Sequence, residues 1–425
     1  MRTCNSLSEE RRDQTIEIRG SRVAIGPQDS IFATIQIGAG RISRIIYDSS
    51  YESNTNASSR IDLTGFLVLP GLINAHDHLE FALFPRLADP PYGNYIDWGE
   101  DIHNKFPDLI AKHRAVPKDV RLCWGGVRNL LCGVTTVSHH NPLWSKLHRS
   151  DFPVRVVQNY GWGHSFALGG DLPLAHAATP DGHPFILHAC EGVDAQARDE
   201  LRQLDKLGLL DANTVLVHGL AIDNDGVATM IAHQASLIIC PSSNYYLFGS
   251  LPDMSSLNRI EYVALGNDSP LTAVGDLLDE IRFAIRSCNI SPRTAYDMVT
   301  TIPAKILRLE HTAGTITESG AADLIAVRDT NLNAADRLRN LSMEDVEFVM
   351  IAGRVHLASQ SILERLPHST RRDLEPLLIG GVTRWLRAPV NHLLQAAEAV
   401  LGRDEVRLGS RIVSRPVFAE AVHAN

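Results

Sequence analysis

His76 and His78, separated by Asp77, form the first group of residues in the sequence that could do chemistry. The pair follows an apolar stretch, LVLPGLINA (67–75), which predicts a strand. Residues two positions apart in a strand point to the same face, so the two imidazoles would project together. Converging neutral imidazoles suit a divalent transition metal. The H-x-H pattern alone, however, has low specificity.

Three further strands end in a residue that can bind a metal or move a proton. These are His188 in PFILHA, His218 in TVLVHG and Asp268 just after EYVALG. A single histidine at a strand end is more often a hydrogen-bonded structural residue, and a single aspartate there is more often a turn or N-cap residue. Four such strand ends in one chain favour a shared site instead.

The strands that carry these residues alternate with helical stretches, which is typical of parallel β/α units. Helices are predicted after Asp194, after Asp223 and over 275–287. Active sites of α/β barrels lie at the carboxyl ends of the strands. The strand candidates are 67–75, 133–139, 154–160, 184–189, 214–219, 236–240 and 261–266.

Both ends of the chain differ from this middle part. Short alternating strands are predicted over 14–48, and again around 314–327 and 347–357, and they would join in one small β-domain. The predicted β-sandwich has an N-terminal part, residues 1–69, and a C-terminal part, residues 346–360, with 314–330 as a further contributor. The predicted barrel spans residues 70–345, and a helical extension spans 361–425. The apolar helical faces of that extension, around Leu393 and Leu394, could cap the sandwich or form a dimer contact.

The motifs PGLINAHDH, HACE, LVHG, CPSSN and GNDS, in this order, resemble the amidohydrolase superfamily, specifically its cytosine deaminase and atrazine–triazine hydrolase-like branch. The resemblance covers about residues 14–358. It implies a distorted (β/α)8-type, TIM-like barrel flanked by a β-sandwich that both chain ends build. The pairing of the two ends expected above agrees with it.

The resemblance also implies a ligand set, carried over residue by residue. His76, His78, His188 and Asp268 would bind one divalent metal ion, with zinc expected and Fe(II) as the alternative. Glu191, His218 and Asp268 would handle protons beside it. The binuclear branches use a carbamylated lysine on a middle strand, but no lysine occurs between Lys146 and Lys206. This favours a mononuclear site.

Two departures from the family pattern concern the middle of the chain. Only the Gly- and Pro-rich residues 161–184 lie between the third strand and the His188 strand, where a complete β/α unit is usual. Either that unit is degenerate or a strand has been missed. Asn267 also precedes Asp268 where threonine is common.

Other residues near the strand ends are candidate substrate-binding groups: Trp98, His140, Asn141, Asn159, Trp162 and Asn244. Surface packing is an equal alternative for Trp98, and a turn role is an equal alternative for Asn244. His139 could also line the pocket. Cys190 is expected in the core, because alternation turns it away from the barrel axis. The remaining histidines from His103 to His183, and His233, are expected to be surface or packing residues.

Composition limits the function classes further. The 425 residues include 40 Lys+Arg and 49 Asp+Glu, a net charge of −9, which argues against a nucleic-acid partner. No apolar run is long enough to cross a bilayer, and the first fifteen residues contain no apolar segment typical of a signal peptide. With six widely spaced cysteines, we expect a cytoplasmic protein with reduced thiols, a small-molecule substrate and a homodimer as one option.

The sequence thus predicts a metal-dependent hydrolase of a C–N bond, with deamination of a nitrogen heterocycle as the first hypothesis. An amide, C–halogen or C–NHR hydrolase acting on a cyclic or triazine-like substrate is the alternative, since the same residues would serve both. A catalytically silent barrel protein is the alternative from another class. The intact set of six site residues argues against it, because such a protein would be expected to have lost one of them.

Overall fold

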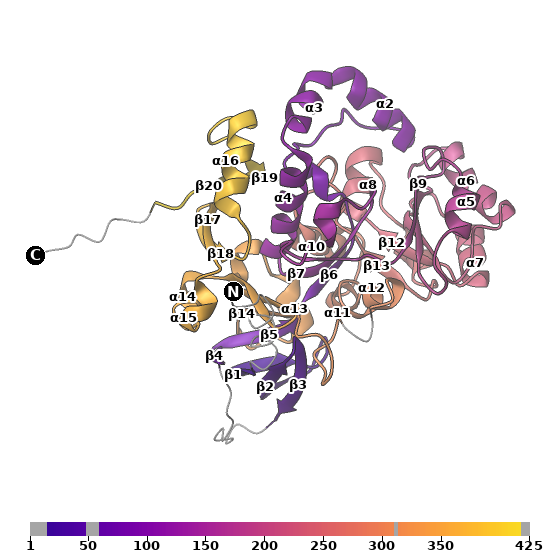
Figure 1. Cartoon of the computed structure of the whole chain (residues 1–425). Coiled ribbons are helices and arrows are strands. Elements are labelled where there is room, and N and C mark those ends of the chain that lie inside the picture. Colours follow the sequence, from indigo (N-terminus) through magenta and orange to yellow (C-terminus); the bar gives the residue numbers. More distant parts are fainter. Residues whose placement is uncertain (1–14, 48–58, 310–312, 418–425) are drawn as a thin grey trace, which may run out of the picture.

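The computed structural model describes residues 15–47, 59–309 and 313–417 (Figure 1). The N-terminal segment on which the absence of a signal peptide was predicted lies outside the described residues, apart from its last residue, Thr15. Among the described residues, no helix is both long and apolar enough to span a membrane.

Eight short parallel strands form the middle of the chain. They make one sheet in the order β6-β7-β8 and another in the order β13-β12-β11-β10-β9. At one junction, the backbone N–H groups of Asn267 and Asp268 donate to His76 O at 3.0 and 3.1 Å. The predicted α/β fold is confirmed, although strand pairing does not close the barrel in the described part of the chain. The strands are β6 (Leu72–Asp77), β7 (Val134–His139), β8 (Arg155–Val156), β9 (Gly161–Ser165), β10 (Phe185–Ala189), β11 (Thr214–His218), β12 (Ser236–Ile239) and β13 (Val263–Leu265).

Strand β9 resolves the shortened unit noted in the sequence. Residues 161–184 contain this strand and the short helix α5 (Leu172–Ala177), so the unit is small and a strand had been missed. The sequence GWGHS has two glycines and no aliphatic residue, and therefore lacks the apolar pattern of a strand. Its backbone pairs in parallel with β10, and this pairing stabilises the strand conformation that its side chains do not favour.

Helices cover the strands, and two of them begin at the predicted caps. Asp194 and Asp223 accept backbone N–H bonds at the starts of α6 (Ala195–Lys206) and α7 (Asn224–Ala232), and Asp276 does so at the start of α10 (Leu277–Ser287). Helices α2 (Tyr95–Lys105) and α3 (Pro107–Arg114) belong to a long excursion between β6 and β7 (Figure 1). The others are α4 (Lys118–Leu131), α6 (Ala195–Lys206), α7 (Asn224–Ala232), α8 (Pro241–Phe248), α9 (Met254–Leu257), α10 (Leu277–Ser287), α11 (Pro292–Asp297), α12 (Thr301–Ile306) and α13 (Ala334–Arg339).

Strands from both chain ends form one further sheet, as expected. β14 (Leu324–Arg328) pairs antiparallel with β5 (Phe66–Pro70), so the two ends meet in the middle of this sheet. β5 is buried on both faces: Phe66 and Val68 contribute to the core within the sheet, whereas Leu67 and Leu69 pack toward the barrel. The neighbouring strands are β1 (Ile16–Ala24), β2 (Ser30–Gly38), β3 (Arg41–Ile46), β4 (Ser59–Asp62), β15 (Val346–Ile351) and β16 (Arg354–Ala358).

The prediction that residues 361–425 are mostly helical is wrong. β17 (Glu375–Ile379) and β18 (Val382–Leu386) form a hairpin, and β18 pairs with β16, which extends the sheet. The two-residue turn Gly380-Gly381 has positive φ at both positions, as a tight hairpin requires. The remaining elements are α14 (Gln360–Leu363), α15 (His368–Arg371), α16 (Val390–Leu401), β19 (Arg407–Leu408) and β20 (Arg411–Ser414).

Helix α16 has the predicted apolar face. Leu393, Leu394 and Ala397 are buried on it. The face packs against the barrel of its own chain: Trp124 of α4 donates its indole N–H to Leu393 O at 3.3 Å, and the buried side chains share one core.

Candidate active site

The structure brings together the residues predicted at the strand ends. His76 lies near the end of β6, His78 directly follows β6, His188 lies on β10, His218 ends β11, and Asp268 follows β13. His76 Nε2 lies 3.2 Å from His188 Nε2 and 3.8 Å from Asp268 Oδ1, and His78 Nε2 lies 3.7 Å from the same oxygen. Two groups, His76–His188–His218 and His76–His78–Asp268, each have ligand atoms within 4.8 Å of one another.

The histidines of this cluster are neutral, as metal ligands must be. Burial lowers the pKa of His76, lowers that of His78 to about 3 and lowers that of His188 well below its usual range. Two neutral ring nitrogens of His76 and His188 face each other, an arrangement that a shared cation stabilises. One group offers three imidazoles and the other two imidazoles and a carboxylate, and both kinds of donor suit a divalent ion.

Asp268 is held as a carboxylate. Burial opposes its ionisation, but the neighbouring imidazoles of His76, His218 and His78 outweigh this and keep its pKa well below the usual range. Ser243 Oγ donates to Oδ2 at 2.7 Å, and the Ser269 N–H donates to Oδ1 at 2.7 Å. These bonds fix the orientation of the carboxylate.

His218 and Glu191 form a neutral pair beside the cluster. His218 Nδ1 lies 3.0 Å from Asn244 Oδ1, so Nδ1 carries the ring proton and the lone pair of Nε2 faces the cavity. Burial lowers the pKa of His218. Burial, together with the charges of Asp268 and Glu200, raises the pKa of Glu191 well above its usual range. The protonated Glu191 Oε2 lies 3.6 Å from His218 Nε2.

Left-handed backbone conformations occur at three of these strand ends. Cys190, His218 and Asp268 have φ values of 54°, 74° and 57°. Residues other than glycine adopt this region at an energetic cost, and such strain concentrates at functional sites. At Cys190 it turns the chain so that the next residue, Glu191, reaches the cavity.

A buried carboxylate, Glu200 of α6, holds that turn. Its Oε2 accepts the Cys190 N–H at 2.7 Å, and its Oε1 accepts the Tyr95 hydroxyl at 3.1 Å. The Tyr95 N–H in turn donates to Glu191 O at 3.2 Å. The start of α2 is therefore attached to the loop that carries Glu191.

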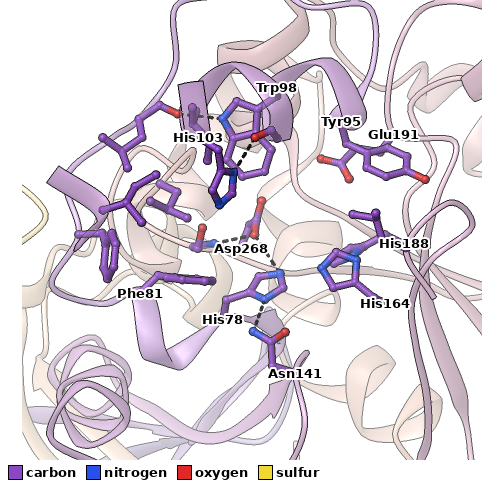
Figure 2. Close-up of a pocket in the computed structure, with 18 of the residues that line it drawn as sticks. His78, Phe81, Tyr95, Trp98, His103, Asn141, His164, His188, Glu191 and Asp268 are labelled. Carbon is purple, nitrogen blue, oxygen red and sulfur yellow. Dashed lines mark hydrogen bonds and ion pairs between the residues drawn. The ribbon is translucent and has the colours of Figure 1, made fainter. Parts of the chain in front are cut away.

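A cavity opens above the cluster (Figure 2). His78, His188, His218, Glu191 and Asp268 line its floor, and Cys190 is buried behind them as predicted. No lysine is among the described residues that line it. The structure thus places the predicted metal and proton-handling residues around one hollow, although His76 lies beneath the surface of the floor.

The six candidate substrate-binding residues divide into two groups. Trp98 and Asn141 line the cavity, and the Asn141 amide lies 3.1 Å from His78 Nδ1. The others lie outside the lining. His140 stacks behind His188 at a ring distance of 4.0 Å, Asn244 lies behind His218, Asn159 is exposed and Trp162 packs beside His140. His139 is buried beside Glu80 and also lies outside the lining.

Two histidines that we expected to be ordinary residues line the cavity. His164 lies near the end of β9, and His103 lies on α2. His103 is also exposed, as expected for a surface residue, and His164 is half-buried. His164 would have been found by the strand-end rule had β9 been recognised. His103 carries no such signal, because the direction of α2 depends on tertiary packing.

Comparison with known proteins agrees with this geometry. The model of the Amidohydrolase family matches residues 170–356. Over these residues, the chain is similar to the amidohydrolase family. The resemblance seen in the motifs is thereby confirmed.

Relatives and solved structures extend the match. A 5-methylthioadenosine/S-adenosylhomocysteine deaminase of Saccharophagus degradans is 26% identical over 70% of this chain and 78% of its own length, and one of Haloquadratum walsbyi is 25% identical over 74% and 84%. A zinc-bound adenosine deaminase of Xanthomonas campestris matches at 18% identity and a TM-score of 0.65, covering 91% of this chain and 97% of its own. An atrazine chlorohydrolase of Arthrobacter aurescens with zinc matches at 18% identity and a TM-score of 0.66, covering 91% of this chain and 99% of its own. At this identity the structures establish the fold.

Proposed function

We propose that this amidohydrolase deaminates an aminated nitrogen heterocycle in a metal-dependent reaction. The observation that carries the proposal is that Glu191 and Asp268 line one cavity floor with His78, His188 and His218, while their surroundings shift the two carboxyl pKa values in opposite directions. Hydrolytic deamination requires a base to activate water and an acid to protonate nitrogen, and two carboxyl groups with opposite pKa shifts provide both. The deaminase relatives support the same reaction.

His76, His78, His188 and Asp268 would hold one ion, and we propose zinc, with Fe(II) as the alternative. When bound, such an ion acts as a Lewis acid and lowers the pKa of a water toward neutrality. The zinc-containing structural neighbours support this choice, and the absence of lysine among the described lining residues supports a single ion.

The protein's own groups divide the proton transfers. Asp268, held ionised, accepts a proton from the attacking water, and the Nε2 lone pair of His218 orients that water. Glu191 delivers its proton to a ring nitrogen as the carbon becomes tetrahedral. The amine takes up the proton from Asp268, the C–N bond breaks and ammonia leaves. The added hydroxyl returns its proton to Glu191, so the carbonyl product forms and the acid is restored.

Ammonia release from a panel of aminated purines, pyrimidines and triazines tests the proposal, with a chlorotriazine included to detect halide release. The enzyme is first loaded with zinc and its metal content is measured by elemental analysis. We expect about one ion per chain and ammonia from at least one compound. H76A provides the matched control, in which metal and turnover are lost together. Full metal content without ammonia from any compound would overturn the proposal.

We also propose a cytoplasmic location. The described cysteines, Cys123, Cys132, Cys190, Cys240 and Cys288, are all free and buried, as in a reducing compartment. A homodimer stays a prediction.

A further inference from the structure

The outer half of the cavity differs in chemistry from its floor. We call it the vestibule and define it by Phe81, Phe84, Leu87, Trp98, Ile102 and Leu271. These residues come from the excursion between β6 and β7 and from the loop after β13. Figure 2 shows Phe81 and Trp98 on the side of the cavity away from Tyr95 and Glu191.

The vestibule wall is packed, and Phe81 lies beside His78 of the metal-competent cluster, with ring centres 6.0 Å apart. Phe84, Leu87, Ile102 and Leu271 are buried in one apolar cluster, and Phe81 packs against it. The rings of Phe81 and Phe84 meet edge to face at 5.3 Å. A substituent on a heterocycle bound at the floor would therefore enter apolar surroundings directly.

Three polar atoms of the cavity wall are already engaged by the protein. Trp98 Nε1 donates to Leu87 O at 2.8 Å, which leaves the indole ring as the available surface. His103 Nδ1 bonds to Gly99 O at 2.7 Å. The Tyr95 hydroxyl donates to Glu200 and accepts the Ala167 N–H at 2.9 Å. The indole and the phenol therefore have little capacity left for the hydroxyl groups of a substrate.

Charges are placed away from the vestibule. Among the described lining residues, the carboxylates are Glu191 and Asp268, and both belong to the floor. Arg114 is the one lining guanidinium in that set, and it is exposed at the end of α3. A ribosyl group would place hydroxyls against the apolar walls of the vestibule, whereas an alkyl or aryl group would bury apolar area there.

We propose that the vestibule is a subsite for an apolar aryl or alkyl substituent of the heterocycle, so that such compounds are preferred to their ribosyl counterparts. This rests on the proposed deaminase function. Such a preference would separate this chain from the relatives above, whose names refer to adenosine compounds.

Matched substrates test the preference. We compare kcat/KM for ammonia release from 9-benzyladenine, adenosine and S-adenosylhomocysteine, together with the benzyl and ribosyl forms of cytosine. On the ring that is deaminated, we expect the benzyl form to be at least about tenfold better than the ribosyl form, a modest ratio for apolar contacts. Ammonia release with an equal or better ribosyl substrate would overturn the subsite and leave the deaminase function intact. A preference for S-adenosylhomocysteine would indicate that the outer cavity binds the charged tail of this compound at Arg114. That result would also overturn the apolar subsite.

A binding measurement keeps the test independent of turnover. Calorimetry with the zinc-loaded protein compares 9-benzylhypoxanthine with inosine, and we expect at least about tenfold tighter binding of the benzyl compound. If no compound yields ammonia but this difference holds, the deaminase function fails while the vestibule stands. Equal binding would overturn the vestibule.

Variants at Phe81 connect the preference to the wall. F81S should reduce the benzyl-to-inosine binding ratio at least fivefold, roughly the effect of losing one aromatic contact. F81L, which stays apolar, should retain most of it. Far-UV circular dichroism and metal content establish that both variants are folded and loaded. An unchanged ratio in a folded F81S would contradict the assignment.

Discussion

At the scale of single residues, burial has opposite effects on two neighbours. It favours the uncharged form of any group, so it raises the pKa of Glu191 and lowers that of His218. Asp268 escapes the same effect because imidazoles and hydroxyl donors surround it. Three buried side chains thus present an acid, a neutral imidazole and a carboxylate to the cavity.

Glu191 is expected to be needed for proton transfer and not for metal binding. E191Q keeps the size and polarity of the side chain but removes the transferable proton. We expect full metal content and a fall in kcat of about 10²–10⁴. Steady-state kinetics of the zinc-loaded variant measure this, and a kcat within tenfold of wild type would remove Glu191 from the acid role.

Glu280 provides a pH prediction for stability. This carboxyl of α10 is fully buried beside Ser242, and burial raises its pKa to about 8. Below pH 4.5 it is protonated in both states. Between pH 4.5 and 8, Glu280 loses its proton in the unfolded chain but keeps it in the folded protein. The free energy of unfolding therefore falls as pH rises.

The isosteric variant E280Q should flatten this dependence, because glutamine does not ionise. The difference in pH dependence between wild type and E280Q should be on the order of 3–5 kcal/mol between pH 4.5 and 8. Urea unfolding across this range measures it, with the exposed Glu100 changed to Gln as control. Parallel curves for wild type and E280Q would contradict the prediction.

The strand-end residues could be predicted from the sequence because one local rule governs them. A polar residue that follows an apolar run marks a strand end, and parallel strands of one barrel place such ends together. This holds for His76, His188 and His218. His103 and Phe81 could not be found this way, since their direction depends on how a long excursion folds back over the cavity.

At the scale of elements, helix α2 and the loop after β10 behave as one piece. The Val193 N–H donates to Gly93 O at 2.8 Å, and Asn94 bridges to Gly192 in antiparallel pairing. A Cβ at Gly192 would approach Gly93 O to 2.6 Å, so only glycine allows this contact. The wall that carries Trp98 is thereby connected to the loop that carries Glu191.

Glu200 joins these two elements and is expected to position Glu191. E200A should lower kcat about tenfold or more with little change in metal content, because a misaligned acid slows the reaction more than it weakens binding. The conservative variant E200Q keeps one of its two hydrogen bonds and should be less impaired.

A double-mutant cycle checks that Glu200 acts through Glu191. In the E191Q background, E200A should cause no further loss of kcat, because the group it positions is already absent. Additive losses would show that Glu200 acts elsewhere. The comparison of kcat with KM separates this role from a general loss of folded protein.

Regular elements were predictable where their pattern is strong, and the failures have physical causes. β9 is short and Gly-rich, so its strand conformation comes from pairing with β10 and not from its side chains. In β17 and β18, PLLIGGVTRWL does contain apolar residues around a Gly-Gly turn, which is a hairpin signal. The helical pattern of α16 directly after it obscured that signal.

At the scale of the whole molecule, α4 connects the C-terminal extension to the site. Trp124 contacts α16, and one turn further Arg128 bonds to Asp77 Oδ2 at 3.3 Å and to Asp268 O at 3.1 Å. Asp77 lies between His76 and His78 in the chain. The extension therefore supports the same helix that braces the metal-competent strands.

A single side chain of α16 can test whether the extension and the barrel unfold together. Leu394 is 1% exposed within the core that includes Trp124, and L394A should destabilise the protein by about 2–5 kcal/mol. Q395A, at the exposed neighbouring position, is the control and should change stability by less than about 0.5 kcal/mol. Because the core is continuous, denaturant unfolding should remain one transition when followed by tryptophan fluorescence and by far-UV circular dichroism, and added zinc should raise its midpoint in both variants. An early transition in L394A that leaves the zinc-dependent transition unmoved would show instead that the extension unfolds separately from the barrel.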